Sequence, residues 1–178
     1  MRERDDGTPG RQTGPATSTT RRSWYGHGTL TRVEKSPVNR YLHDVTYVFA
    51  DVSIPSLPVL VLVMLSSTEP GFGPVPATMV AWATLVVVAA AIRGGWIQPP
   101  ATDAPGWVAV TPSLVAVRLI YYNLVLFAAA YGSVALADAV GTPAASLGFA
   151  FLIALLATLL FPRVAESAYR WLLAALDQ

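Results

Sequence analysis

The sequence predicts an all-α membrane protein: a four-transmembrane-helix bundle with a disordered N-terminal tail and a C-terminal amphipathic helix. Apolar residues make up 53% of the chain and charged residues only 13%, whereas soluble domains carry about 25% charged residues. Four long apolar segments follow Val45 and are separated by short connections that contain Pro and Gly. The basic residues gather before these segments, since eight of the twelve Lys and Arg lie before Val45.

The first 22 residues are rich in Gly, Pro, Thr, Ser, Arg and Asp, and they contain no apolar run. This composition cannot bury enough apolar surface to offset the entropy of ordering, so we expect residues 1–22 to form a disordered cytoplasmic tail. A cleavable signal peptide is also not expected, because it would need an apolar core. Arg21 and Arg22 form the dipeptide of a twin-arginine signal, but mostly polar residues separate them from the first apolar segment. We interpret them as a solvated basic pair.

Residues 23–44 form a juxtamembrane segment of mixed composition that leads into the transmembrane domain, residues 45–161. Ser36 and Pro37 are the residue types favoured at a helix N-cap and at the first helical position. We therefore expect residues 37–44 to form an interfacial turn or two that runs into the first span, residues 45–65. A helix of this length reaches about 31 Å, which matches a hydrocarbon core about 30 Å thick. The other spans are expected at residues 76–92, 113–137 and 143–161.

The final segment, residues 162–178, differs from the spans because its polar side chains fall on one side of a helix. We expect an amphipathic surface helix that begins at Pro162, with Glu166 and Arg170 paired one turn apart. Such a helix either lies on the membrane or packs on the bundle or on a partner helix. Its aromatic and basic residues, Tyr169, Arg170 and Trp171, favour the membrane surface.

The positions of Lys and Arg predict the orientation of the chain. The N-terminal segment holds eight of them, the second connection holds Arg93, and the C-terminal segment holds Arg163 and Arg170, whereas the first and third connections hold none. Cytoplasmic loops carry an excess of Lys and Arg. We therefore expect a multi-pass protein of the cell membrane with both termini in the cytoplasm.

Motifs that would indicate an enzyme or a cofactor site are missing. The sequence contains no phosphate-binding glycine loop, no nucleophile elbow and no zinc-protease motif. It has no cysteine, and His27 and His43 lack acidic neighbours at the spacing of metal ligands. A net charge of +1 gives no field suited to nucleic acid. We expect no catalytic activity, no cofactor, no bound metal and no nucleic-acid partner.

Small residues spaced four apart occur in three of the spans and would permit close helix approach. They are Ala77 with Ala81, Ala128 with Gly132, and Ala150 with Ala154. Because such pairs arise by chance in alanine-rich helices, they indicate no particular interface.

Two ionisable side chains lie inside the expected spans, Asp51 in the first and Arg118 in the third. Both spans start from the cytoplasmic side, and at about 1.5 Å per residue both side chains reach a depth of roughly 8 to 9 Å. An unpaired charge in a membrane is costly, and pairing removes much of the cost. We therefore predict that Asp51 pairs with Arg118. The pair serves either as a structural lock or as a functional site that holds a proton or an ion.

Further polarity is expected around this pair. Tyr121 and Tyr122 lie about one turn from Arg118, where they would donate to Asp51 or stack on the guanidinium. Pro55 and Pro58 lack an N–H and are expected to kink the first helix beside the pair. The predicted intramembrane polar cluster consists of Asp51, Arg118, Tyr121 and Tyr122, next to a kink at Pro55 and Pro58.

Over residues 36–178, the layout of spans resembles small uncharacterised four-span membrane proteins of halophilic archaea and other GC-rich prokaryotes. The resemblance includes the segments LHDVTYVFADVSIPSLPVLVLVML and TPSLVAVRLIYYNLVLF. It implies a class of membrane protein and no particular activity.

Two functional hypotheses follow from these observations. The first is a non-enzymatic scaffold or modulator of membrane partners, which would use the tail and the C-terminal helix as contact surfaces. The second is a small oligomeric transporter or channel subunit with a polar site around Asp51 and Arg118. The expected partners are the lipid bilayer and either further copies of the chain or other membrane proteins.

Overall fold

The computed structural model describes residues 14–25, 32–66, 72–100, 102 and 112–176. These residues form helices and one small antiparallel sheet, in which Trp24 pairs with Val33. The elements are α1 (Gly14–Thr17), α2 (Thr19–Arg22), β1 (Ser23–Tyr25), β2 (Arg32–Glu34), α3 (Pro37–Ser66), α4 (Pro74–Arg93), α5 (Pro112–Phe127), the π-helical turn η1 (Ala128–Gly132), α6 (Ser133–Val140) and α7 (Ala145–Leu176).

Among the described residues, four helical segments are long and apolar enough to cross a membrane, which confirms the predicted four-helix fold. They are Pro37–Ser66, Pro74–Arg93, Leu114–Val140 and Ala145–Trp171. The third is continuous from α5 through η1 into α6. The first two segments contain the predicted spans, whereas the third begins one position after residue 113 and the fourth begins two positions after Pro143.

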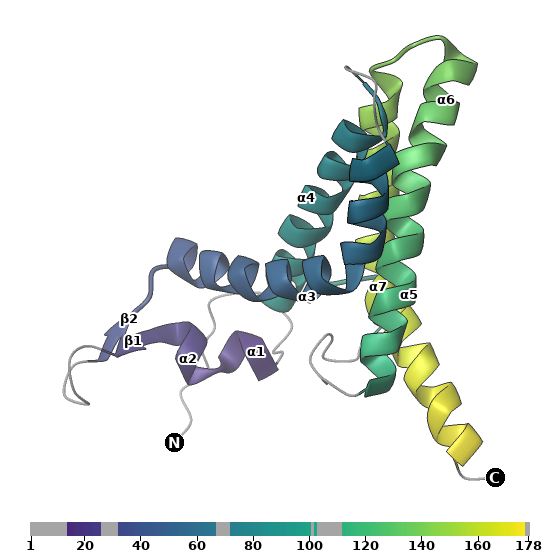
Figure 1. Ribbon diagram of the computed structural model, residues 1–178. Helices are drawn as coiled ribbons and strands as arrows, with labels where there is room; N and C mark the ends of the chain where they lie inside the picture. Colours follow the sequence, from purple (N-terminus) through teal and green to yellow (C-terminus); the bar gives the residue numbers. More distant parts are fainter. Residues whose placement is uncertain (1–13, 26–31, 67–71, 101, 103–111, 177–178) are drawn as a thin grey trace.

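The helices alternate in direction along the bundle (Figure 1). The end of α4 at Arg93, the start of α5 and the end of α7 lie at the same end as α2, and we call this the basic end. The turns between α3 and α4 and between α6 and α7 lie at the opposite end.

The core of the bundle is built largely from small side chains. α4 packs against α7, and Ala77 and Ala81 of α4 are fully buried, as are Ala150 and Ala154 of α7. Small residues let two helix backbones approach closely, which increases dispersion contacts in a medium that gives no hydrophobic drive between helices. Two of the three small-residue pairs therefore mark a real helix contact, and Ala128 and Gly132 are only half-buried.

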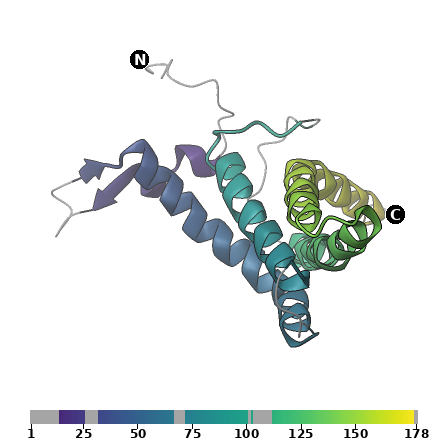
Figure 2. The same ribbon diagram turned by 90° about the horizontal axis from the view of Figure 1, so that it is seen from above.

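The largest difference between the structure and the predicted bundle is a sharp bend in α3. Its first arm, residues 37–54, crosses the basic end, and its second arm, residues 55–66, runs along the other helices (Figures 1 and 2). Pro55 and Pro58 lie inside this helix, and an internal proline removes a backbone hydrogen bond and clashes with the preceding turn. The part of α3 that follows the bundle thus starts near Pro55, not at Val45.

The C-terminal segment is helical, as predicted, but it is not a separate element. α7 runs through Pro162 without interruption, and its last turns extend beyond the bundle at the basic end (Figure 1). Glu166 pairs with Arg170 on the same helix and accepts a hydrogen bond from Thr102 Oγ1 at 2.6 Å.

The predicted disordered tail is only partly described, because residues 1–13 lie outside the described residues. Within that tail, Gly14–Thr17 and Thr19–Arg22 form short helices. They pack beneath the first arm of α3 (Figures 1 and 2). The C-terminal part of the predicted tail, residues 14–22, is therefore helical in this structure, where a long-range ion pair of Arg21, described below, joins it to α3. The connection residues Glu69 and Trp107 also lie outside the described residues.

Candidate functional site

The structure joins the two ionisable residues that the sequence singled out. Arg118 Nη1 of α5 lies 3.1 Å from Asp51 Oδ1 of α3. The Arg118 side chain is buried, whereas 24% of the Asp51 side chain is exposed. Asp51 lies in the first arm, one turn before Pro55, so the two residues meet because α3 bends and not because two straight spans place them at equal depth.

The two tyrosines behave differently from the prediction. Tyr121 donates its hydroxyl to the backbone carbonyl of Ala157 at 2.8 Å, so it does not donate to Asp51. Tyr122 stacks on the ring of Phe161, with ring centroids 5.2 Å apart and an angle of 26°. Its ring is buried, and its hydroxyl makes no hydrogen bond with any described residue. Tyr122 lies within electrostatic range of Asp51 and Arg118, so of the two tyrosines it is Tyr122 that borders the ion pair.

Asn123 completes this region, and the sequence analysis missed it. Its Nδ2 donates to the carbonyl of Pro55 at 2.6 Å, and its Oδ1 accepts from the N–H of Val59 at 3.0 Å. In a regular helix these two backbone groups would bond to each other, four residues apart. The amide of Asn123 is thus inserted into the opened ladder of α3 and satisfies both groups. A lone asparagine in an apolar span was the available signal, because a polar side chain in lipid needs a partner.

A contact from α4 holds the other side of the bend. Trp82 Nε1 donates to Ser53 Oγ at 3.1 Å, and the Trp82 ring meets Phe49 edge-on with centroids 5.3 Å apart. The bend of α3 is therefore fixed by α5 through Asn123 and by α4 through Trp82.

A second polar group, also missed, lies at the basic end. Arg21 Nε lies 2.6 Å from Asp44 Oδ2, and both side chains are almost fully buried at 4% and 1% exposure. Arg93 Nε lies 3.8 Å from Asp44 Oδ1. The interpretation of Arg21 as a solvated residue is wrong, because it joins the N-terminal segment to α3 and to the end of α4.

Backbone groups strengthen this attachment. Arg21 Nη1 donates to the carbonyl of Ala16 at 2.9 Å, and Nη2 donates to the carbonyl of Gly94 at 3.2 Å. A Cβ on Gly94 would lie 2.7 Å from Asp44 Oδ2, so the close approach requires glycine. We call Arg21, Asp44, Arg93 and Gly94 the clamp.

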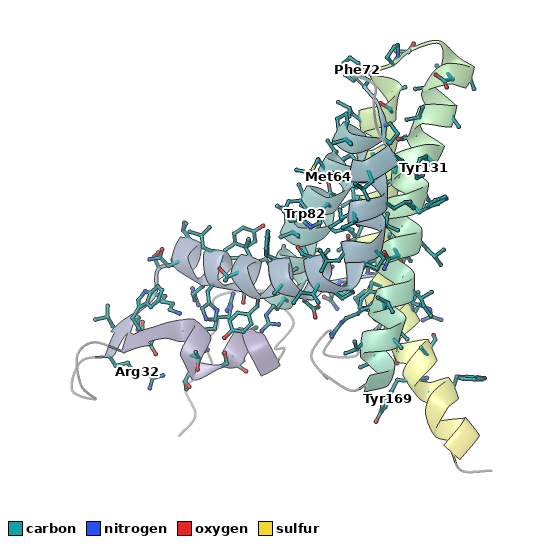
Figure 3. The ribbon with its side chains drawn as sticks, viewed as in Figure 1. Arg32, Met64, Phe72, Trp82, Tyr131 and Tyr169 are labelled. Atoms are coloured by element: carbon teal, nitrogen blue, oxygen red, sulfur yellow. The ribbon has the colours of Figure 1, made fainter. Side chains whose placement is uncertain are left out.

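A groove of about 330 Å³ lies between the second arm of α3 and α4, and it is lined by Leu60, Val63, Met64, Val75, Thr78, Met79 and Trp82. Figure 3 shows Met64 and Trp82 on the same side of the bundle, above the first arm. Thr78 Oγ1 donates within α4 at 2.7 Å, and Trp82 Nε1 is bonded to Ser53. The groove is therefore lined by apolar surface, and the polar atoms of Thr78 and Trp82 are already hydrogen-bonded within the protein.

The described residues contain no group of three or more His, Cys, Asp or Glu side chains that could hold a metal ion. Of the two histidines, His43 packs against Tyr47, with ring centroids 4.9 Å apart, and His27 lies outside the described residues. The chemistry available in the described spans is thus charge pairing and hydrogen bonding between helices.

Comparison with known proteins identifies the family of the chain. No match was found among curated proteins, and none was found among solved structures. The sequence model of one family, described as "Domain of unknown function (DUF8215)", matches residues 35–168. This range holds both buried ion pairs except for Arg21, and it covers most of the chain, so the protein belongs to the DUF8215 family.

Proposed function

We propose that this protein is a non-enzymatic membrane scaffold that presents an ordered surface to partners at its basic end. The observation that carries the proposal is the clamp. It buries an arginine of the N-terminal segment against an aspartate of α3, at 4% and 1% exposure. Removing one partner of a buried pair leaves the other charge uncompensated, at a cost of about 3 to 5 kcal/mol, so we expect loss of either side chain to release the N-terminal segment from the helix ends.

The clamp turns the N-terminal segment into a platform, which we define as residues 14–25 and 32–35. Lys35 Nζ donates to the carbonyl of Thr20 at 2.9 Å and lies 4.0 Å from the centre of the Trp24 ring. Trp24, Arg32 and Val33 remain exposed on its surface. An ordered surface with exposed aromatic and arginine side chains is suited to protein contacts, in which these residue types are enriched.

The end of α7 adds a second surface at the same end of the molecule. Tyr169, Arg170 and Trp171 are exposed there, and Figure 3 places Tyr169 on the part of α7 that leaves the bundle. The platform and this helix end both lie at the basic end, where α4 ends at Arg93 (Figure 1). The excess of basic residues supports a cytoplasmic location for this side and a place in the cell membrane.

A second candidate function is a small oligomeric transporter or channel subunit. Two observations favour it: Asp51 is partly exposed beside a bent helix, and the buried Tyr122 hydroxyl has no hydrogen-bond partner among the described residues. Charged groups beside broken helices form ion and proton sites in transporters.

Flux through vesicles separates the two candidates. We expect purified protein in liposomes to carry no proton or potassium current above that of empty vesicles, because Asp51 is held by Arg118 and the groove is apolar. The measurement is pH-dye and potassium-dye fluorescence under an imposed gradient.

A flux that Asp51→Asn abolishes would contradict the scaffold and establish the second candidate. Asp138→Asn is the matched control, since it removes the same charge from an exposed position of α6. A flux that both variants abolish equally would point to a general change in charge and not to the site.

A further inference from the structure

We infer that the first arm of α3 lies in the plane of the membrane, at the interface of the leaflet on the basic side. Its apolar side faces the acyl chains, and its polar side faces headgroups and water. The inference concerns how the chain sits in the bilayer and is independent of the scaffold proposal.

The direction of the arm is the first observation. Residues 37–54 run across the bundle axis, while α5, α6 and α7 run along it (Figures 1 and 2). If the bundle axis follows the membrane normal, the arm lies parallel to the membrane. The arm is fixed in this direction by Asn123 and Trp82, which hold the bend on both sides.

The distribution of side chains around the arm is the second observation. Val38, Leu42, Val45 and Phe49 recur every three or four residues and lie about 100° to 160° around the helix from Asp44, at 100° per residue. Asp44 faces α2 through its pair with Arg21. Because α2 lies beneath the arm (Figure 1), the apolar stripe is turned toward the side on which the spans rise.

The opposite side of the arm carries polar and basic side chains. Arg40 and Tyr47 fall within about 60° of Asp44 around the helix, and the guanidinium of Arg93 lies 4.9 Å from the centre of the Tyr47 ring. Amphipathic helices with basic polar faces lie in the interface with their apolar side buried about 5 to 10 Å below the headgroups.

Length is the third observation. The second arm, residues 55–66, is about 18 Å long at 1.5 Å per residue, which is too short for a hydrocarbon core of about 30 Å. An in-plane arm buried by about 5 to 10 Å supplies a large part of the missing depth of about 12 Å. An embedded first arm therefore accounts for the short second arm.

The basic residues near the arm indicate which type of lipid headgroup it faces. Arg22 and Arg32 are exposed on α2 and β2, and Arg40 lies on the polar side of the arm. Basic residues near a membrane surface attract anionic headgroups, by about 1 kcal/mol per residue. The arm is thus matched to a leaflet that contains anionic phospholipid.

Depth measurements on spin labels test the inference. The chain has no cysteine, so single cysteines replace the exposed Val38, Leu42 and Phe49, and the labelled proteins are placed in vesicles of phosphatidylcholine and phosphatidylglycerol. Power saturation with oxygen and a nickel complex then gives the depth of each label. We expect all three labels at one depth, just below the headgroups.

The matched control uses α4, which runs along the bundle. Labels on the exposed Met79 and Val87 should differ in depth by roughly 12 Å, at 1.5 Å per residue. If depth instead changes by roughly 16 Å between positions 38 and 49, the arm is upright and the inference is wrong. The inference is also wrong if all three labels lie in water. It is equally wrong if their spectra are broadened by contact with a second copy of the chain that shields them from lipid.

Discussion

Asn123 illustrates how single polar residues are used in this protein. Backbone groups inside a membrane must be satisfied within the protein, because lipid offers no hydrogen bonds. Pro55 and Pro58 inside α3 lack the N–H groups that would bond to the carbonyls of the preceding turn. At the bend, the amide of Asn123 from α5 bridges a further pair of backbone groups by donating to the carbonyl of Pro55 and accepting from the N–H of Val59. The bend is thus a property of two helices and not of the prolines alone.

Removing this amide should destabilise the bent protein and leave a straightened one nearly unaffected. Asn123→Ala leaves the carbonyl of Pro55 and the N–H of Val59 without partners, at a cost of about 1 to 3 kcal/mol. In a Pro55→Ala/Pro58→Ala background those groups can bond to each other, so the same substitution should cost much less. Unfolding in mixed micelles measures both.

The control is Leu124→Ala, which changes the next residue at a 63% exposed position and should have little effect in either background. An equal cost of Asn123→Ala in the bent and the straightened proteins would show that the amide does not serve the bend.

At the level of helices, the sequence predicted those features that depend on local patterns. The lengths of the apolar segments predicted the four spans, and the cost of an unpaired charge in a membrane predicted the pairing of Asp51 with Arg118. The prolines indicated a kink, but its size depends on Asn123 and Trp82, which come from other helices. The order of residues 14–22 depends on Asp44, which lies 23 residues from Arg21. The composition of a segment says only which residue types it contains, so it could not reveal a partner that lies far away in the sequence.

The clamp gives a prediction for the connection between α4 and the N-terminal segment. Gly94→Ala places a Cβ 2.4 Å from two ring atoms of Trp96 and 2.7 Å from Asp44 Oδ2. Both side chains must shift, and we expect the shift of the carboxylate to weaken its pair with Arg21. We expect faster trypsin cleavage after Arg21 in the folded protein. Limited proteolysis followed by mass spectrometry measures the rate.

Gly148→Ala is the matched control, since a Cβ there meets no atom within 4 Å. In the helical interior of α7 this change should leave cleavage after Arg21 unchanged and raise stability by at most about 1 kcal/mol. Unchanged cleavage in Gly94→Ala would show that the clamp does not hold the N-terminal segment.

For the whole molecule, the arrangement separates a basic end from an end that carries Asp138. The first arm of α3, the platform and the end of α7 all lie at the basic end (Figure 1). Between the two ends, the bundle is held by close contacts of small residues and by the ion pair of Asp51 and Arg118. We propose that this asymmetric bundle spans the membrane with its basic end in the cytoplasm.

Labelling of single cysteines in intact cells tests that claim most directly. Thr20→Cys and Ser167→Cys place exposed thiols at the basic end, and Asp138→Cys places one at the other end. An impermeant maleimide should label only Asp138→Cys from outside, and the other two should react only after the membrane is permeabilised. Labelling of Thr20→Cys from outside, or of Thr20→Cys and Asp138→Cys from the same side, would contradict the account.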